Sequence, residues 1–123
     1  MSLKEKMQLR TRNLALEVIT LCNRISRTTQ NQIISKQLIR ASCSVGANYR
    51  AVSRAKSPPD FINKLSVVEE EADEAIFWLE LLQELEPGLK DKIVACSSEM
   101  NEILSIVVAS RKTAKRNLSN SKN

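Results

Sequence analysis

Residues 61–82 read FINKLSVVEEEADEAIFWLELL, and this stretch decides the fold class. Its apolar residues recur at intervals of three and four: Phe61, Leu65, Val68, Ala72, Ala75, Leu79 and Leu82. That spacing places them along one side of an α-helix, where they form a seam that must be buried against other helices. Six of the other fifteen residues are acidic, as expected for the side facing water. The stretch therefore predicts an amphipathic helix.

The same spacing recurs before and after this stretch. The further seams are Leu14, Val18, Leu21 and Ile25; then Ile34, Leu38, Ala41, Val45, Val52 and Ala55; then Leu89, Ile93, Cys96, Met100, Ile103 and Val107. Asn48 occupies the one missing place in the second of these seams, where a buried amide would need hydrogen-bond partners. We predict helices over about residues 3–27, 30–56, 58–85 and 89–115.

Local signals separate the four predicted helices. One of the threonines Thr28 and Thr29 can cap the second helix, with Gln32 reaching back in a capping box. Ser57 can cap the third helix, because Pro58 suits a first helical position and Asp60 can complete a second box. Pro87 and Gly88 end that helix. Such short links predict one domain over residues 1–116, an all-α antiparallel up-down-up-down four-helix bundle, followed by a disordered basic tail over residues 117–123.

Composition excludes most catalytic classes. The 123 residues include no histidine and only two glycines, so His-dependent nucleophiles, imidazole metal sites and a Gly-rich phosphate loop are ruled out. Three widely spaced cysteines, Cys22, Cys43 and Cys96, are expected to be reduced and buried. The charged N-terminus and the lack of an uncharged apolar span predict a cytoplasmic protein away from membranes. We expect a non-enzymatic protein without cofactors.

The net charge is +5, but the basic and acidic residues are concentrated in different segments of the chain. Residues 29–57 carry five basic and no acidic side chains, whereas residues 58–86 carry one basic and nine acidic side chains. Opposite the seam of the second helix, a basic stripe is formed by Lys36, Arg40, Arg50 and Arg54. It is either a binding surface for nucleic-acid phosphates or a solvated face that matches the acidic third helix. No aromatic residues alternate with these cations, so any nucleic-acid binding would be to the backbone.

The third helix carries apolar residues away from its seam. Val67, Phe77, Trp78 and Leu81 lie roughly opposite the seam, and Glu70, Glu71 and Glu74 share that side. These residues could be partly covered by neighbouring helices of the same chain. They could instead form a subunit interface with aromatic anchors, which is the interpretation we favour because exposed Trp and Phe usually contact a partner.

Residues 37–50, QLIRASCSVGANYR, resemble the signature of the four helix bundle protein family, whose founding members are encoded in 23S ribosomal RNA intervening sequences. The resemblance continues through Arg54–Ser57, Asp60–Ile62 and Trp78–Leu82, and covers about half the chain. Ala51 departs from it, because the family commonly has a glutamate there.

The resemblance implies a ring-like homo-oligomer, a pentamer, with a basic surface. A related group is formed by the accessory variability proteins of diversity-generating retroelements, which bind nucleic acid and a reverse transcriptase. We therefore expect an oligomeric scaffold that binds RNA or DNA backbone independently of sequence. The alternative is an adaptor that docks an acidic protein partner or a reverse transcriptase. Fold alone does not decide between them.

Overall fold

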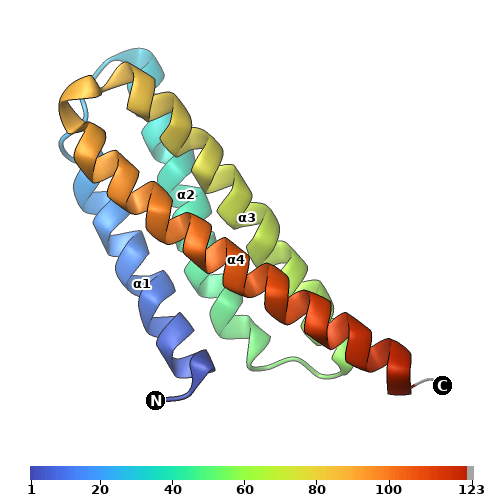
Figure 1. Ribbon diagram of the computed structural model, residues 1–123. Helices are drawn as coiled ribbons and strands as arrows, with labels where there is room; N and C mark the ends of the chain where they lie inside the picture. Colours follow the sequence, from blue (N-terminus) through green and yellow to red (C-terminus); the bar gives the residue numbers. More distant parts are fainter. Residues whose placement is uncertain (122–123) are drawn as a thin grey trace.

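A computed structural model describes residues 1–121 and contains four long helices (Figure 1). These are α1 (Leu3–Cys22), α2 (Thr29–Val52), α3 (Pro58–Leu85) and α4 (Lys90–Ser121), with a short 3-10 helix η1 (Pro87–Leu89) before α4. No strand occurs in this part of the chain. The all-α class predicted from the apolar spacing is confirmed.

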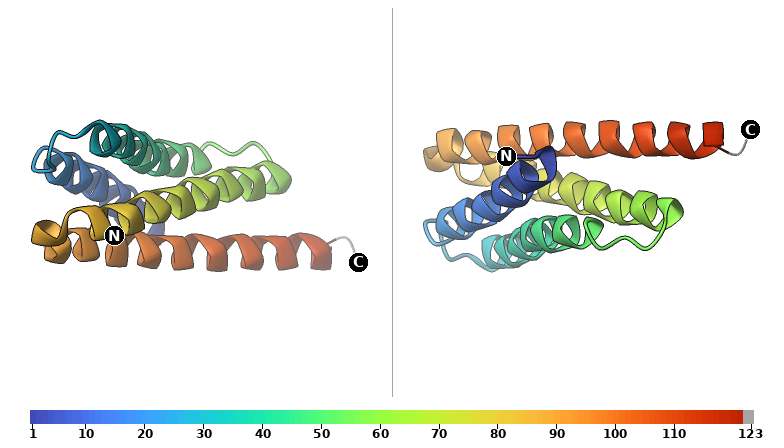
Figure 2. Two further views of the ribbon diagram at one scale, coloured as in Figure 1. Left: turned by 90° about the horizontal axis from the view of Figure 1, so that it is seen from above. Right: turned by 90° about the horizontal axis from the view of Figure 1, so that it is seen from below.

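Each helix packs against the next one along the chain, and α4 returns to contact α1. The α1–α2 and α3–α4 links lie at one end of the molecule, and the α2–α3 link lies at the other (Figures 1 and 2). The contact between α1 and α4 is the least extensive of the four. Figure 1 shows these two helices separating toward the chain termini. The packing is that of a bundle with one open corner.

The predicted seams form most of the core. Leu38, Leu79 and Ile103 are fully buried, together with most other seam residues. The second seam differs from its prediction at two places, because Asn48 and Ala55 are only partly buried. Tyr49 takes the core position beside Asn48, whose amide instead donates to the Ser44 carbonyl oxygen at 2.8 Å. Adjacent residues of a helix point 100° apart, so Tyr49 can enter the core at the level where Asn48 lies only at its edge.

The caps explain where two helices begin. The Thr28 hydroxyl accepts a hydrogen bond from the Asn31 backbone amide at 3.2 Å, and Ser57 does the same for Asp60 at 3.2 Å. The predicted N-caps of α2 and α3 are therefore confirmed. The structure gives no hydrogen bond from Gln32 back to the first turn of α2, so that part of the capping box was wrong. The Asp60 carboxylate does reach back, but it accepts from the backbone amide of Lys56.

Two helices end earlier than predicted and one ends later. Helix α1 ends at Cys22 instead of about residue 27, and α2 ends at Val52 instead of about residue 56, each followed by turns with i to i+3 hydrogen bonds. Helix α4 continues to Ser121. The disordered tail predicted over residues 117–123 was therefore wrong up to residue 121, and residues 122 and 123 lie outside the described part. No glycine or proline follows Gly88 to stop α4.

Gly46 lies inside α2 where α1 comes close. A Cβ atom built at this position would lie 3.6 Å from the carbonyl oxygen of Thr11 on α1, which is ordinary van der Waals contact. The helix pair therefore has room for a methyl group here but for little more.

Candidate nucleic-acid and subunit interfaces

Arg40 joins α2 to α3. Its guanidinium donates to the Glu71 carboxylate at 3.0 Å, to the Glu74 carboxylate, and to the Gln37 side-chain oxygen at 3.2 Å. Hydrogen bonds to Glu74 and then Glu71 raise the Arg40 pKa above its ordinary value. Arg40 therefore pairs with carboxylates of the acidic third helix, which was one of the two interpretations of the basic stripe.

Trp78 extends the Arg40 network. Its indole Nε1 donates to the Glu74 carboxylate at 3.0 Å, and this hydrogen bond, with the one from Arg40, lowers the Glu74 pKa. Two of the three glutamates predicted to lie at a subunit interface are thus engaged within the chain. Glu70, the third, is exposed and forms no ion pair within residues 1–121.

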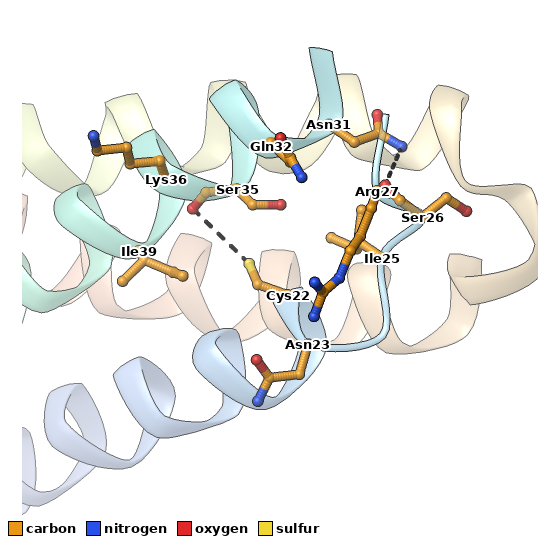
Figure 3. Close-up of a pocket in the computed structure, with 10 residues that line it drawn as sticks. All are labelled: Cys22, Asn23, Ile25, Ser26, Arg27, Asn31, Gln32, Ser35, Lys36 and Ile39. Carbon is orange, nitrogen blue, oxygen red and sulfur yellow. Dashed lines mark hydrogen bonds between the residues drawn. The ribbon is translucent and has the colours of Figure 1, made fainter. Parts of the chain in front are cut away.

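The other cations of the predicted stripe are free of carboxylates. Lys36, Arg50 and Arg54 are exposed, and none of them forms an ion pair within the described chain. Lys36 lies toward the α1–α2 link, where it borders a cavity together with Arg27 (Figure 3). Arg50 lies in the last turn of α2, at the opposite end, and Arg54 lies in the turn after Val52, outside the helix on which the stripe was predicted. Because Arg40 is paired within the chain, the unpaired cations of the stripe are Lys36 at one end and Arg50 and Arg54 at the other.

The apolar residues off the α3 seam differ in exposure. Phe77 is 49% exposed, whereas Trp78 and Leu81 are half-buried against the core. The Phe77 and Trp78 rings meet edge to face, with centroids 5.0 Å apart and an interplanar angle of 65°. Such a pair holds Phe77 in place at the surface. Coverage by the same chain thus accounts for part of this set, and Phe77 remains available for a partner.

Further ion pairs connect helices that are distant in sequence. Arg10 on α1 donates to Glu99 on α4 at 2.6 Å and 2.9 Å, and Arg111 on α4 donates to Glu69 on α3 at 2.6 Å. These pairs were not predicted from the sequence. The sequence shows basic and acidic residues on separate helices. Which charges meet depends on the register between the helices, and core packing alone fixes that register.

A cavity of about 380 Å³ lies beside the α1–α2 link (Figure 3). Asn31 is 4% exposed, and its side-chain amide donates to the Ser26 carbonyl oxygen at 3.2 Å and to the Glu86 carboxylate at 3.0 Å. Its Oδ1 atom has no hydrogen-bond partner in the described chain. The amide thereby holds the α1–α2 link to the residue that ends α3.

The cysteines are all free thiols, but they are not uniformly buried. Cys96 is buried and Cys22 is half-buried, whereas Cys43 is exposed. The expectation that all three are buried was wrong for Cys43, because this residue lies on the side of α2 opposite the seam. Burial raises the pKa of the Cys22 thiol, and it raises that of Cys96 to about 11. Within residues 1–121, no three His, Cys, Asp or Glu side chains come together as metal ligands.

The fold and its charged surfaces define a class of small all-α proteins with four helices. The model of the 23S rRNA-intervening sequence protein family matches residues 4–109, and the chain belongs to this family. The family resemblance recognised in the sequence is confirmed. No curated protein is similar enough to be matched to the chain.

A solved structure is similar to this chain. It is a protein with unknown function from the S23 ribosomal protein family of Bacteroides thetaiotaomicron, 28% identical in sequence, with a TM-score of 0.79. The match covers 89% of this chain and 97% of that one. The four-helix arrangement is thus shared over nearly the whole length of both proteins.

Proposed function

We propose that this protein is a non-enzymatic scaffold. In this proposal, antiparallel four-helix bundles assemble into a ring-like homo-oligomer, a pentamer, and bind RNA or DNA backbone independently of sequence. The observation that carries the binding proposal is the exposed pair Arg50 and Arg54, which lacks carboxylate partners in the described chain. Arg50 lies in the last turn of α2, a helix without acidic residues, and Arg54 lies in the turn that follows.

Arg50 and Arg54 suit phosphate for electrostatic reasons. An arginine already held by two carboxylates, such as Arg40, has little to gain from a phosphate, whereas an unpaired one keeps its full set of donors. Arg50 lies in the last turn of α2, and Arg54 lies in the following turn, where its backbone amide donates to the Ala51 carbonyl oxygen at 3.0 Å. Lys56, exposed in the α2–α3 link, adds charge nearby. Lys36 contributes at the far end of α2, and Arg40 maintains the α2–α3 contact.

The proposal is tested with Arg50→Glu/Arg54→Glu in one chain. The measurement is the affinity for an RNA duplex and a DNA duplex of unrelated sequence, each at several salt concentrations. We expect binding to fall at least tenfold, and the slope of log affinity against log salt to become shallower by about 2, because each lost phosphate contact removes about one released counterion.

A matched control is Arg24→Glu/Arg27→Glu, which makes the same charge change at the α1–α2 link. The control should lose much less affinity than the Arg50/Arg54 variant. Equal loss in both variants would mean that only net charge matters. Unchanged binding by the Arg50/Arg54 variant would show that the pair is not the site.

A second candidate function is an adaptor in which the same exposed cations dock an acidic protein, such as the acidic surface of a reverse transcriptase. The exposed aromatic residue Phe77 favours this candidate, because an apolar side chain can anchor a protein partner but gains little from contact with a charged nucleic-acid backbone. Absence of duplex binding by the wild-type chain at low salt would favour this candidate over the first.

A further inference from the structure

An apolar groove lies where α1 and α4 separate. Its volume is about 600 Å³, and it is lined by Leu3 of α1, Phe61 of α3, and Ile106, Ala109, Ser110, Thr113, Ala114 and Asn117 of α4. No charged side chain lines this groove. A smaller hollow formed by Pro58, Ala114 and Leu118 continues it toward the end of α4.

The groove exists because α1 and α4 differ in length. Arg10 ties α1 to Glu99 and Glu102 of α4, and beyond this clamp the remaining turns of α1 end at Leu3. Helix α4 runs on to Ser121. By length and composition, Pro87–Ser121 is apolar enough to cross a membrane, yet only 28% of its most apolar 18-residue window is buried. On the groove side of α4, Ile106 is only partly buried and Ala109 is exposed.

The helix turns beside the groove are strongly basic. They carry Lys4 and Lys6 on α1 and Lys112, Lys115 and Arg116 on α4, all exposed. None of these five forms an ion pair within the part of the chain that the structure describes. Glu5 is the one acidic residue on the same turns. A partner for the groove must bring apolar side chains together with negative charge.

The outer side of α3 has this chemistry. Phe77 is 49% exposed there, and Glu70, Asp73, Glu80 and Glu84 are exposed and form no ion pair within residues 1–121. At 100° per residue, these five residues lie within about 80° of arc. We call them the acidic α3 face. Its aromatic residue is held by Trp78, so the face presents a fixed apolar anchor surrounded by carboxylates.

We propose that the groove between α1 and α4 receives the acidic α3 face of a second copy of this chain. The inference rests on the proposed homo-oligomer and names the two surfaces that join its subunits. Because the surfaces are different, the contact is head-to-tail: each copy offers one face and one groove, and repetition closes into a ring or continues as a filament.

Two other occupants fit less well. Nucleic-acid backbone would meet the cations, but it would leave Leu3, Phe61 and Ile106 covered by a charged chain without apolar contact. A symmetric contact of groove with groove would bring the same lysines and arginine of two copies together, which opposes association. The acidic α3 face offers Phe77 to the apolar residues of the groove and carboxylates to the basic residues beside it.

The test uses two single variants that each remove one surface. Ala109→Glu places a carboxylate in the groove at an exposed helical position, and Phe77→Glu removes the anchor from the α3 face. Ala95→Glu is the matched control, since Ala95 is also exposed on α4 but lies outside this groove. Mass is measured by light scattering at micromolar concentration, and helicity by circular dichroism.

We expect wild type and Ala95→Glu to be oligomers, and both test variants to be folded monomers of 13.8 kDa. Mixed in equal amounts, the two test variants should form a heterodimer of twice that mass and nothing larger, because one intact groove meets one intact face. Monomers that stay separate on mixing, or an Ala109→Glu variant with the wild-type mass, would overturn the inference while leaving the homo-oligomer in place. A monomeric wild type would overturn the homo-oligomer itself, and the inference with it.

Discussion

The side-chain amide of Asn31, near the start of α2, donates a hydrogen bond to the carboxylate of Glu86, the residue that ends α3, at 3.0 Å. The same carboxylate oxygen accepts from the backbone amide of Ser26 at 2.8 Å. One acidic side chain thereby joins the α1–α2 link to the α3–α4 link. Asn31 is 4% exposed, so removing this carboxylate would leave its buried amide with the Ser26 carbonyl oxygen as its one acceptor.

Replacing Glu86 with alanine should therefore destabilise the fold. We expect a loss of about 1–3 kcal/mol in the free energy of unfolding, because the buried amide of Asn31 loses an acceptor. Urea denaturation followed by circular dichroism measures it. Glu17→Ala, which removes an exposed carboxylate on α1 without an ion pair in the described chain, is the control and should change stability by less than about 0.5 kcal/mol. Equal effects of the two substitutions would contradict this role for Glu86.

The network of Arg40, Glu74 and Trp78 predicts a pH dependence. Hydrogen bonds from Trp78 and Arg40 lower the Glu74 pKa in the folded chain below its ordinary value of 4.5. The unfolded chain therefore binds this proton more readily, so ionised Glu74 stabilises the fold above about pH 4.5. That contribution is lost as the pH falls through the lower, folded-state pKa.

The comparison of wild type with Glu74→Gln isolates this carboxylate. The melting temperature of the wild type should exceed that of the variant near neutral pH, and the difference should shrink as the pH falls below about 4.5. Glu17→Gln, at an exposed position on α1 without an ion pair, is the control and should change the melting temperature little. Parallel curves for wild type and Glu74→Gln would contradict the prediction.

Gly46 offers a stabilising substitution. Glycine inside a helix costs about 0.5–1 kcal/mol relative to alanine, and the added methyl group would lie 3.6 Å from the Thr11 carbonyl oxygen without a clash. Gly46→Ala should therefore raise the free energy of unfolding by about that amount. Gly46→Leu should lower it by about 1–3 kcal/mol, because the larger side chain must push α1 away. A destabilised alanine variant would show that α1 and α2 need a closer approach.

The three thiols should react at different rates. At about pH 8, Cys43 is exposed and should react rapidly with a disulfide reagent, whereas Cys96, with a pKa raised to about 11, has little thiolate and no access. Half-buried Cys22 should react between them. Cys43→Ser should abolish the rapid phase, and denaturant should release all the remaining thiols. A rapid phase that survives in Cys43→Ser would contradict this order.

The sequence predicted α3 to the residue, because Ser57, Pro58 and Pro87 mark both of its ends. It did not predict the end of α1. Ile25 continues the helical spacing and is buried, yet the backbone has already left the helix at Cys22. Burial was correctly predicted there and helicity was not, since an apolar side chain can reach the core from a turn.

The interaction surfaces were less predictable than the fold. The partners of Arg40 lie 31 and 34 residues further along the chain, and only the register between α2 and α3 brings them within reach. The groove beside Ala109 depends on where α1 starts relative to α4, which no local signal encodes. Patterns within one helix are visible in a sequence, but distances between helices are set by the packing of the whole core.

Trp78 is the only tryptophan in the chain, and it lies between the ring of Phe77 and the carboxylate of Glu74. The tryptophan fluorescence of the protein therefore comes from one place on α3. An indole beside a carboxylate and next to water emits differently once another surface covers it. Trp78 emission recorded while the protein is diluted would therefore report, without an added label, whether a partner covers Phe77 on that side of α3.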